Sequence, residues 1–189
     1  VSAKPVFPRQ PMRLATIGRL VRQKGHDILL LALSMLEKED WTLDVFGEGP
    51  VECSLKAEAY HLALEKRVRW HGAVDNVDKH LQDIDIVVQP SRYEGMSLTV
   101  MEAMAAGRVL MVSAAAGEGL VENMKTGYVV QNEKVESLVS ALRYVSQYRD
   151  EARTVAQGAQ RYASEHFGID KHIARLKEIY HDVCKVNDT

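Results

Sequence analysis

The sequence predicts a doubly wound, Rossmann-like α/β fold, in which helices cover both faces of a parallel β-sheet. Short apolar segments without polar alternation recur along the chain, and segments with apolar residues at helical spacing lie between them. Strands of this kind are buried on both faces, because right-handed crossovers place helices over each side of the sheet. With 189 residues, 46% of them hydrophobic, the chain is the size of one domain with a normal core.

Strands and helices alternate from residue 13 to residue 130. The first strand is expected at residues 13–18, and apolar side chains between residues 28 and 36 predict the helix that follows. Further strands are expected at residues 41–46, 68–71, 84–89, 109–113 and 128–130, with helices through residues 56–64, near residues 80–81, over residues 98–106 and as one turn over residues 120–124.

The two ends of the chain differ from its middle. Residues 1–12 hold three of the five prolines, which predicts a linker or the tail of a preceding segment, so the domain is expected at residues 13–186. After residue 132, three helices are expected at residues 135–147, 151–166 and 173–186. The chain does not begin with methionine, and we expect it to be part of a longer protein.

Charge and cysteine content narrow the possible partners. The formal charge of −2 gives no reason to expect nucleic acid or an anionic membrane as a partner of the whole molecule. Six basic and no acidic residues precede Asp27, which is consistent with a local anion site or with a solvated basic leader. Cys53 and Cys184 lie far apart in no metal-binding pattern, and no secretory signal is evident, so reduced thiols in the cytoplasm are expected.

In doubly wound sheets, ligands bind outside the carboxyl ends of the strands, so the loops that leave strands are the first places to search. The loop at residues 18–25 follows the first strand and leads into a helix. Gly18 permits close backbone approach, and Arg19 and Lys24 can neutralise a diphosphate at a helix amino terminus. The alternative is that these cations are surface residues that bind no ligand, and Arg22 is interpreted as solvated.

The second loop, Gly47-Glu48-Gly49-Pro50, follows the second strand. A single Gly-x-Gly is a weak signal, because a tight turn before a helix explains it without a ligand. The dinucleotide-binding fingerprint is not present, since it requires three glycines after the first strand and an acidic residue about 20 positions later.

The third loop is the most informative stretch and runs from Pro90 through the helix that ends near Gly107. Ser97 is placed to cap that helix, which would aim the amides of residues 95–99 at the strand-end cleft. Glu94 in the loop and Glu102 in the helix are suitable acceptors for the vicinal hydroxyls of a sugar or a ribose. Glu102 is also explained without a ligand, as a solvated carboxylate favoured by the helix dipole and kept ionised by it.

Taken together, these motifs resemble a known family. Gly18-Arg19-Leu20 with Lys24-Gly25, Gly47-Glu48-Gly49, Pro90-Ser91, Glu94-Gly95 with Glu102-Ala103-Met104-Ala105-Ala106-Gly107, and finally Glu122 and Gly127 occur in the order and spacing of the carboxyl-terminal domain of family 4 retaining glycosyltransferases of GT-B fold. The resemblance covers nearly all of residues 13–186. Two glutamates separated by seven residues, in an alanine- and glycine-rich context, are its specific part.

The resemblance implies roles for individual residues. Arg19 and Lys24 would hold the donor diphosphate and stabilise the leaving group, so that no metal and no other cofactor is needed, and Glu94 would contact the donor sugar. These three are the implied catalytic residues. The implied substrate-binding residues include Gly18 and Gly47, with Val74 beside the nucleobase. Glu102 would hold the ribose, and Glu122 would lie near the diphosphate. The amides near the sugar and diphosphate would be those of Gly95, Met96, Ser97 and Leu98.

The chain also departs from the family pattern. Relatives commonly have proline after the helix, where this chain has Arg108-Val109, and an aromatic residue followed by proline where it has Met96-Ser97. The second change is expected to alter sugar selectivity. The family places the acceptor site and usually a histidine in an amino-terminal domain, for which we expect no counterpart within these 189 residues. The histidines of this chain are interpreted as core or surface residues. The last helix is expected to brace that other domain or to cap its own.

The function predicted is that of the donor-binding half of a retaining glycosyltransferase, inactive alone. The donor would be a nucleoside-diphosphate sugar, and UDP-sugar is the most frequent donor in the family. The acceptor would be a glycan or a lipid-linked molecule in surface polysaccharide biosynthesis. The enzyme would work in the cytoplasm or at the cytoplasmic face of the membrane. A GT-B-fold sugar-nucleotide epimerase and a noncatalytic binding or assembly domain are the alternatives. A hydrolase is excluded, because both glutamates fit ligand-holding positions and nothing in the sequence indicates a raised pKa.

Overall fold

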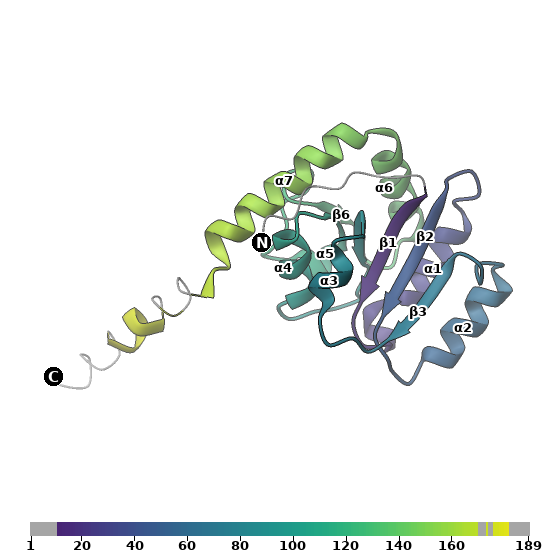
Figure 1. The fold of residues 1–189 in the computed structure, drawn as a ribbon, viewed down its shortest axis with the longest axis horizontal. Coiled ribbons are helices and arrows are strands. Elements are labelled where there is room, and N and C mark those ends of the chain that lie inside the picture. Colours follow the sequence, from purple (N-terminus) through teal and green to yellow (C-terminus); the bar gives the residue numbers. More distant parts are fainter. Residues whose placement is uncertain (1–10, 170–172, 174–175, 182–189) are drawn as a thin grey trace.

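The computed structural model describes residues 11–169, 173 and 176–181 and confirms the predicted fold class. Six parallel strands form one sheet in the order β3-β2-β1-β4-β5-β6. Figure 1 shows β3, β2 and β1 side by side. The strand order reverses between β1 and β4, so the loops leaving these two strands flank the position where ligands bind in such sheets. The strands are β1 (Met12–Ile17), β2 (Trp41–Phe46), β3 (Val68–Gly72), β4 (Ile86–Gln89), β5 (Val109–Ser113) and β6 (Tyr128–Val130).

Helices cover both faces of the sheet and divide the core into two layers. Apolar residues of α1 (His26–Ser34), α2 (Glu52–His61) and α6 (Val135–Gln147) share one buried cluster. Residues of α3 (Val77–Leu81), α4 (Leu98–Ala105) and α5 (Ala114–Gly117) share the other cluster, and α7 (Arg149–His166) contributes to both. A single turn of 3-10 helix, η1 (Arg22–Lys24), precedes α1.

Side chains that alternate along each strand join the two layers. On β1, Leu14 belongs to the first cluster and Ala15 to the second, and both are fully buried. Burying one leucine side chain contributes about 1.5–3 kcal/mol to stability, so a continuous core on both faces holds the strand ends firmly in place. The loops at the carboxyl end of the sheet therefore rest on a rigid base.

Several predicted boundaries were wrong. The predicted helical turn at residues 120–124 is absent; instead α5 follows β5 directly, because the Ser113 hydroxyl caps it by accepting from the Ala116 amide at 3.2 Å. Asn123 and Gly127 then form an isolated bridge. Met12, assigned to the linker, is buried and begins β1.

Two further predictions concern helix ends. Ser97 occupies the amino-terminal cap position of α4, but its side chain makes no capping hydrogen bond and is buried instead. Gly107 ends α4 in the left-handed conformation, at φ 65°, and donates to the Met104 carbonyl, as its position after the helix predicts. Of the helix expected at residues 173–186, residues 173 and 176–181 are helical and exposed, and the others lie outside the described residues.

Candidate functional site: the loops after β1 and β4

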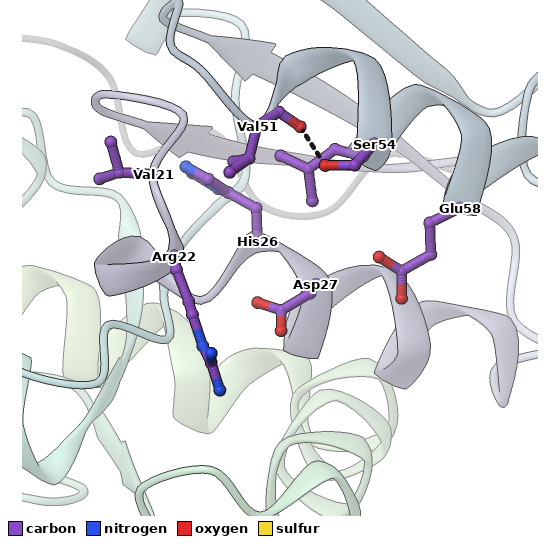
Figure 2. A pocket seen from close by; sticks show the side chains of 8 residues that line it. Val21, Arg22, His26, Asp27, Val51, Ser54 and Glu58 are labelled. Atoms are coloured by element: carbon purple, nitrogen blue, oxygen red, sulfur yellow. Dashed lines mark hydrogen bonds between the residues drawn. The ribbon is translucent and has the colours of Figure 1, made fainter.

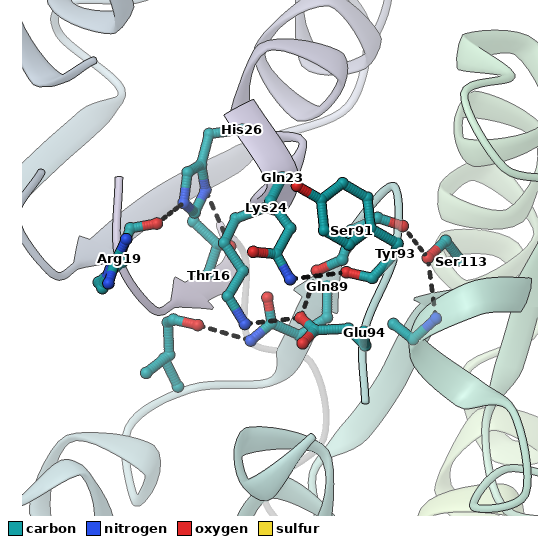
Figure 3. Close-up of polar contacts among 12 residues, drawn as sticks. Thr16, Arg19, Gln23, Lys24, His26, Gln89, Ser91, Tyr93, Glu94 and Ser113 are labelled. Carbon is teal, nitrogen blue, oxygen red and sulfur yellow. Dashed lines mark hydrogen bonds and ion pairs between the residues drawn. The ribbon is translucent and has the colours of Figure 1, made fainter. Parts of the chain in front are cut away.

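An ion pair joins the first and third loops of the sequence prediction. Lys24 Nζ lies 2.6 Å from Glu94 Oε1, and the Ser91 hydroxyl donates to the same oxygen at 2.8 Å (Figure 3). The two side chains are 18% and 8% exposed, so the pair is largely shielded from solvent. The sequence places the cation on a phosphate and the carboxylate on a sugar, and the structure brings the two groups into direct contact.

Backbone contacts hold these two loops together. Gly25 has φ 69°, and a Cβ on it would lie 2.2 Å from the Pro90 carbonyl oxygen, so only glycine fits there. The Arg92 amide donates to the Gln23 carbonyl at 2.8 Å, and the Gln23 side-chain amide returns a bond to the Tyr93 carbonyl at 2.9 Å. The loops are therefore locked in register beside the ion pair.

Arg92 adds a second charged link, which the sequence motifs did not suggest. Its guanidinium binds the Asp27 carboxylate through two nitrogens, at 2.9 and 2.7 Å, and also contacts Glu133 at 2.9 Å. Burial acts to raise the pKa of Asp27, but hydrogen bonds and charge from Arg92 outweigh it and leave the pKa below its ordinary value. Because 65 residues separate the partners, only the folded chain reveals the pair.

His26 lies beneath the first loop and is a buried structural residue, as interpreted from the sequence. Its ring nitrogens lie 3.4 Å from the Thr16 hydroxyl and 3.3 Å from the Arg19 carbonyl oxygen (Figure 3). A carbonyl only accepts, so we assign the proton to Nε2, with Nδ1 accepting from Thr16. Burial lowers the pKa of His26, which favours this neutral form.

Gln89 is another polar residue at this edge of the sheet that the motifs did not suggest. It ends β4 and is fully buried, and its side-chain amide donates to the Ile17 carbonyl at 2.6 Å (Figure 3). Its carbonyl oxygen has no hydrogen-bond partner among the described residues. Gln89 thus ties the end of β4 to the end of β1, directly below the ion pair.

The glycines of the second loop are explained by close packing on the first. Gly47 has φ 135°, and a Cβ on it would lie 2.0 Å from the Gly18 carbonyl oxygen. The Gly18 amide donates to the Phe46 carbonyl at 2.9 Å, and the Leu20 amide donates to the Glu48 carbonyl at 2.8 Å. The tight-turn interpretation of Gly-x-Gly is therefore sufficient to explain these residues structurally.

A cavity of about 330 Å³ opens where the first and second loops meet the loop after β3. Four of the predicted site residues line it, together with apolar and acidic neighbours. Its lining consists of Ile17, Gly18, Arg19, Phe46, Gly47, Glu48, Ala73, Val74 and Val77. The structure therefore brings the predicted nucleobase neighbour and a predicted phosphate ligand to one hollow.

The remaining cation and carboxylate of the prediction are exposed. Within the described residues, neither Arg19 nor Glu102 has an ion-pair or hydrogen-bond partner for its side chain. Partial burial of the Glu102 carboxyl group, with a smaller contribution from the charge of Asp78, raises its pKa above the ordinary value. The sequence indicated no such shift, because the partial burial of the carboxyl group and the approach of Asp78 from α3 both arise only in the folded chain.

The other predicted residues divide into two groups. Gly95, Met96 and Leu98 are exposed at the start of α4, with Met96 72% and Leu98 67% accessible. Glu122 lies apart from the ion pair, in the loop between α5 and β6, where its carboxylate pairs with Lys125. The structure therefore groups the loop residues of β1, β2, β3 and β4, whereas the Glu122 carboxylate is already engaged elsewhere.

A second hollow, of about 240 Å³, is lined by residues of the first loop and of helices α1 and α2 (Figure 2). The Asp27 and Glu58 carboxylates border it, from α1 and α2 (Figure 2). Burial raises the pKa of Glu58, with a smaller contribution from the negative charge of Asp27. This hollow contains none of the predicted donor-site residues.

Comparison with known proteins identifies the family. The model of the family described as glycosyl transferases group 1 matches residues 2–162 of this chain. The chain belongs to this family. The match includes the first three loops of the site, and the parallel sheet is the one found in GT-B glycosyltransferases.

Relatives extend the comparison. The chain is 30% identical to the lipopolysaccharide core biosynthesis mannosyltransferase LpcC of Rhizobium leguminosarum bv. viciae over 181 residues. The aligned region covers 90% of this chain and 51% of that protein. A crystal structure of Anabaena HepE with UDP has a TM-score of 0.86 at 22% identity, over 92% of this chain and 49% of that one. The carboxyl-terminal domain of LpcC from Francisella tularensis gives 0.77 at 21% identity, over 86% and 89% of the two chains.

The chain spans about half the length of the curated relatives it matches. In the part that the structure describes, no helix has the length and apolar character needed to cross a bilayer. No group of three or more histidine, cysteine, aspartate or glutamate side chains converges there as a metal site.

Proposed function

We propose that this chain is the donor-binding half of a retaining glycosyltransferase that uses a nucleoside-diphosphate sugar, most simply a UDP-sugar. The observation that carries the proposal is the ion pair of Lys24 and Glu94, at the reversal of strand order, beside the cavity that Arg19 and Val74 line. Support for the nucleotide comes from Anabaena HepE, whose similar fold was solved in complex with UDP.

The chemistry required of the site is stabilisation of a departing nucleoside diphosphate. Arg19, which is exposed and has no described partner, and Lys24, which lies at the end of η1 and is held by Glu94, supply two positive charges at the same strand end. Cations placed beside the departing diphosphate favour the charge that develops on the leaving group. They perform the task that a divalent metal would otherwise perform, so we infer metal-independent transfer.

Glu94 is proposed to hold the donor sugar. Both hydrogen bonds described for its carboxylate end on Oε1, from Lys24 and Ser91, which leaves Oε2 to accept from a sugar hydroxyl. The carboxylate is thereby fixed before the donor arrives, and a preorganised acceptor loses little entropy on binding. Glu94 would contact the sugar through Oε2, while Lys24 turns its other donors toward the diphosphate.

The other contacts follow from the same placement. Val74 would border the nucleobase in the cavity, with Gly18 and Gly47 forming its floor, and Glu102 would accept from the ribose hydroxyls. The backbone amides of Gly95, Met96, Ser97 and Leu98 would face the sugar and diphosphate, and Glu122 would approach the diphosphate only after releasing Lys125.

The wider role is also part of the proposal. The relative LpcC is named a lipopolysaccharide core mannosyltransferase, which supports a glycan or lipid-linked acceptor in surface polysaccharide synthesis. We infer that a preceding domain of the same protein supplies the acceptor site, and that the whole enzyme works in the cytoplasm, including the cytoplasmic face of the membrane. The donor half would bind without completing transfer.

Calorimetry tests the proposal. The chain is titrated with UDP, GDP and ADP and with their sugars, in the presence of a chelator, and we expect one base to bind without added metal. Repeating the titration with Mg²⁺ should leave the affinity unchanged. If none of the nucleotides binds, the donor-site proposal is wrong, and a noncatalytic assembly domain becomes the better interpretation.

A further inference from the structure

We propose that Arg92 is a positioning residue that clamps the loop carrying Lys24 onto the loop carrying Glu94. The proposal rests on the proposed function, because it concerns how the donor site is held in its binding geometry. Arg92 touches neither member of the ion pair. It acts through the backbone and side chains on either side of them.

The contacts of Arg92 bracket Lys24. One guanidinium nitrogen donates to the Arg22 carbonyl at 2.6 Å, at the beginning of η1. The same nitrogen and its neighbour bind the Asp27 carboxylate, just after the start of α1. Lys24 lies between these two anchored points, so the clamp fixes the segment that presents its ammonium group.

The clamp also fixes the third loop. Arg92 lies two residues before Glu94, and its own amide donates to the Gln23 carbonyl. Its side chain, 14% exposed, reaches Glu133 beyond β6 through Nε at 2.9 Å. Residues 22–27 and Glu133 are thus held by one guanidinium. Its planar set of donors matches a carboxylate in a way that a lysine ammonium does not.

Substitution of Arg92 by lysine tests the clamp, because it keeps the positive charge and removes the two-pronged contact. We expect the Kd for UDP to rise about tenfold, the ratio given by a loss of 1.4 kcal/mol. Asp27→Asn is a second variant that removes the other half of the contact with little change in size, and it should weaken binding in the same direction.

A double-mutant cycle separates positioning from general destabilisation. If Arg92 acts through Lys24, then Arg92→Lys should weaken UDP binding much less in a chain that already carries Lys24→Ala. Arg143→Lys is the matched control, since Arg143 binds Glu39 and the Met35 carbonyl at the far end of α1. This control should leave the Kd unchanged, and circular dichroism should show all variants folded.

The outcomes are distinct. A wild-type chain that binds UDP while Arg92→Lys and Asp27→Asn bind it equally well overturns the clamp and leaves the proposed function standing. Equal weakening by Arg92→Lys in the presence and absence of Lys24 also overturns it, because the effect would then not pass through the ammonium group. A wild-type chain that binds no nucleotide overturns the proposed function and the positioning role together.

Discussion

Two seams flank the first loop, and they are built differently. The β1–β4 seam, between residues 22–27 and 90–94, contains two charged links, Lys24 on Glu94 and Arg92 on Asp27, in addition to backbone contacts such as Gly25 packed on the Pro90 carbonyl. The β1–β2 seam, between residues 18–20 and 46–49, is closed by backbone hydrogen bonds and by glycines packed against carbonyl groups. Both lie at the same edge of the sheet.

The difference suggests that the two seams have different roles in ligand binding. Charged groups can take an additional partner when an anion arrives, because an ammonium with three donors can bind a phosphate without releasing its carboxylate. Backbone contacts without space for a Cβ cannot rearrange in this way, and they preserve the shape of the cavity beside them. The β1–β4 seam is thus suited to respond to the diphosphate, and the β1–β2 seam to shape the pocket for the base.

Breaking the β1–β2 seam should have the largest effect, and that effect is on stability. Gly47→Ala places a Cβ against the Gly18 carbonyl in a backbone conformation that L-residues rarely adopt. Strain and overlap together should lower the free energy of unfolding by about 3 kcal/mol, measured by urea denaturation.

Gly95→Ala provides the matched control for that prediction. A Cβ on Gly95 would meet nothing within 4 Å, and its φ is not positive. Its effect on the free energy of unfolding should stay within about 0.5 kcal/mol. Equal destabilisation by the two alanines would show that packing of the β1–β2 seam is not what requires glycine.

Breaking the β1–β4 seam should affect binding more than folding. Lys24→Ala removes the cation next to Glu94, and the loss of charged hydrogen bonds worth about 2 kcal/mol corresponds to a Kd for UDP about 30-fold higher. Calorimetry measures the change.

Two further variants sharpen the result. Lys24→Met keeps most of the aliphatic stem, which packs beside Gly18, and should weaken binding as much as alanine does if charge is responsible. Lys66→Ala removes an exposed lysine after α2 and should leave the Kd unchanged. Undiminished affinity in both Lys24 variants would remove the main phosphate ligand from the proposed site.

The smallest expected effect concerns pH. The pKa of His26 in the folded chain lies below its ordinary value of 6.5, so the unfolded chain takes up the proton first as pH falls. Stability from the neutral ring is therefore present above pH 6.5 and is lost progressively as the pH falls below it.

Chemical denaturation as a function of pH measures this loss. His26→Gln should flatten the dependence of unfolding free energy on pH in this range, whereas His61→Gln, on the exposed end of α2, should not. A slope unaltered by His26→Gln would mean that the buried ring does not account for the pH dependence.

The success of the sequence prediction varied with the range of the interaction concerned. Uninterrupted apolar segments and apolar residues at helical spacing are local signals, and they predicted the sheet and most helices. The glycine after α4 is another local signal, and it predicted the end of that helix. The prediction of a helical turn at residues 120–124 was wrong. The Ser113 hydroxyl caps α5, and the helix therefore begins earlier in the chain than predicted. Whether Arg19, Glu94 and Glu102 bind a donor stays a prediction until nucleotides are tested.

The sequence by itself determined the fold class, the order of the elements and the loops in which polar chemistry is concentrated, because periodicity and turn residues act over short distances. Only the tertiary structure decided that Lys24 meets Glu94, that Arg92 meets Asp27 and that Glu102 has a raised pKa. Each of these depends on groups far apart in the chain, or on burial, and both arise when the strands assemble into a sheet. The reversal of strand order between β1 and β4 is the physical reason that these distant loops become neighbours.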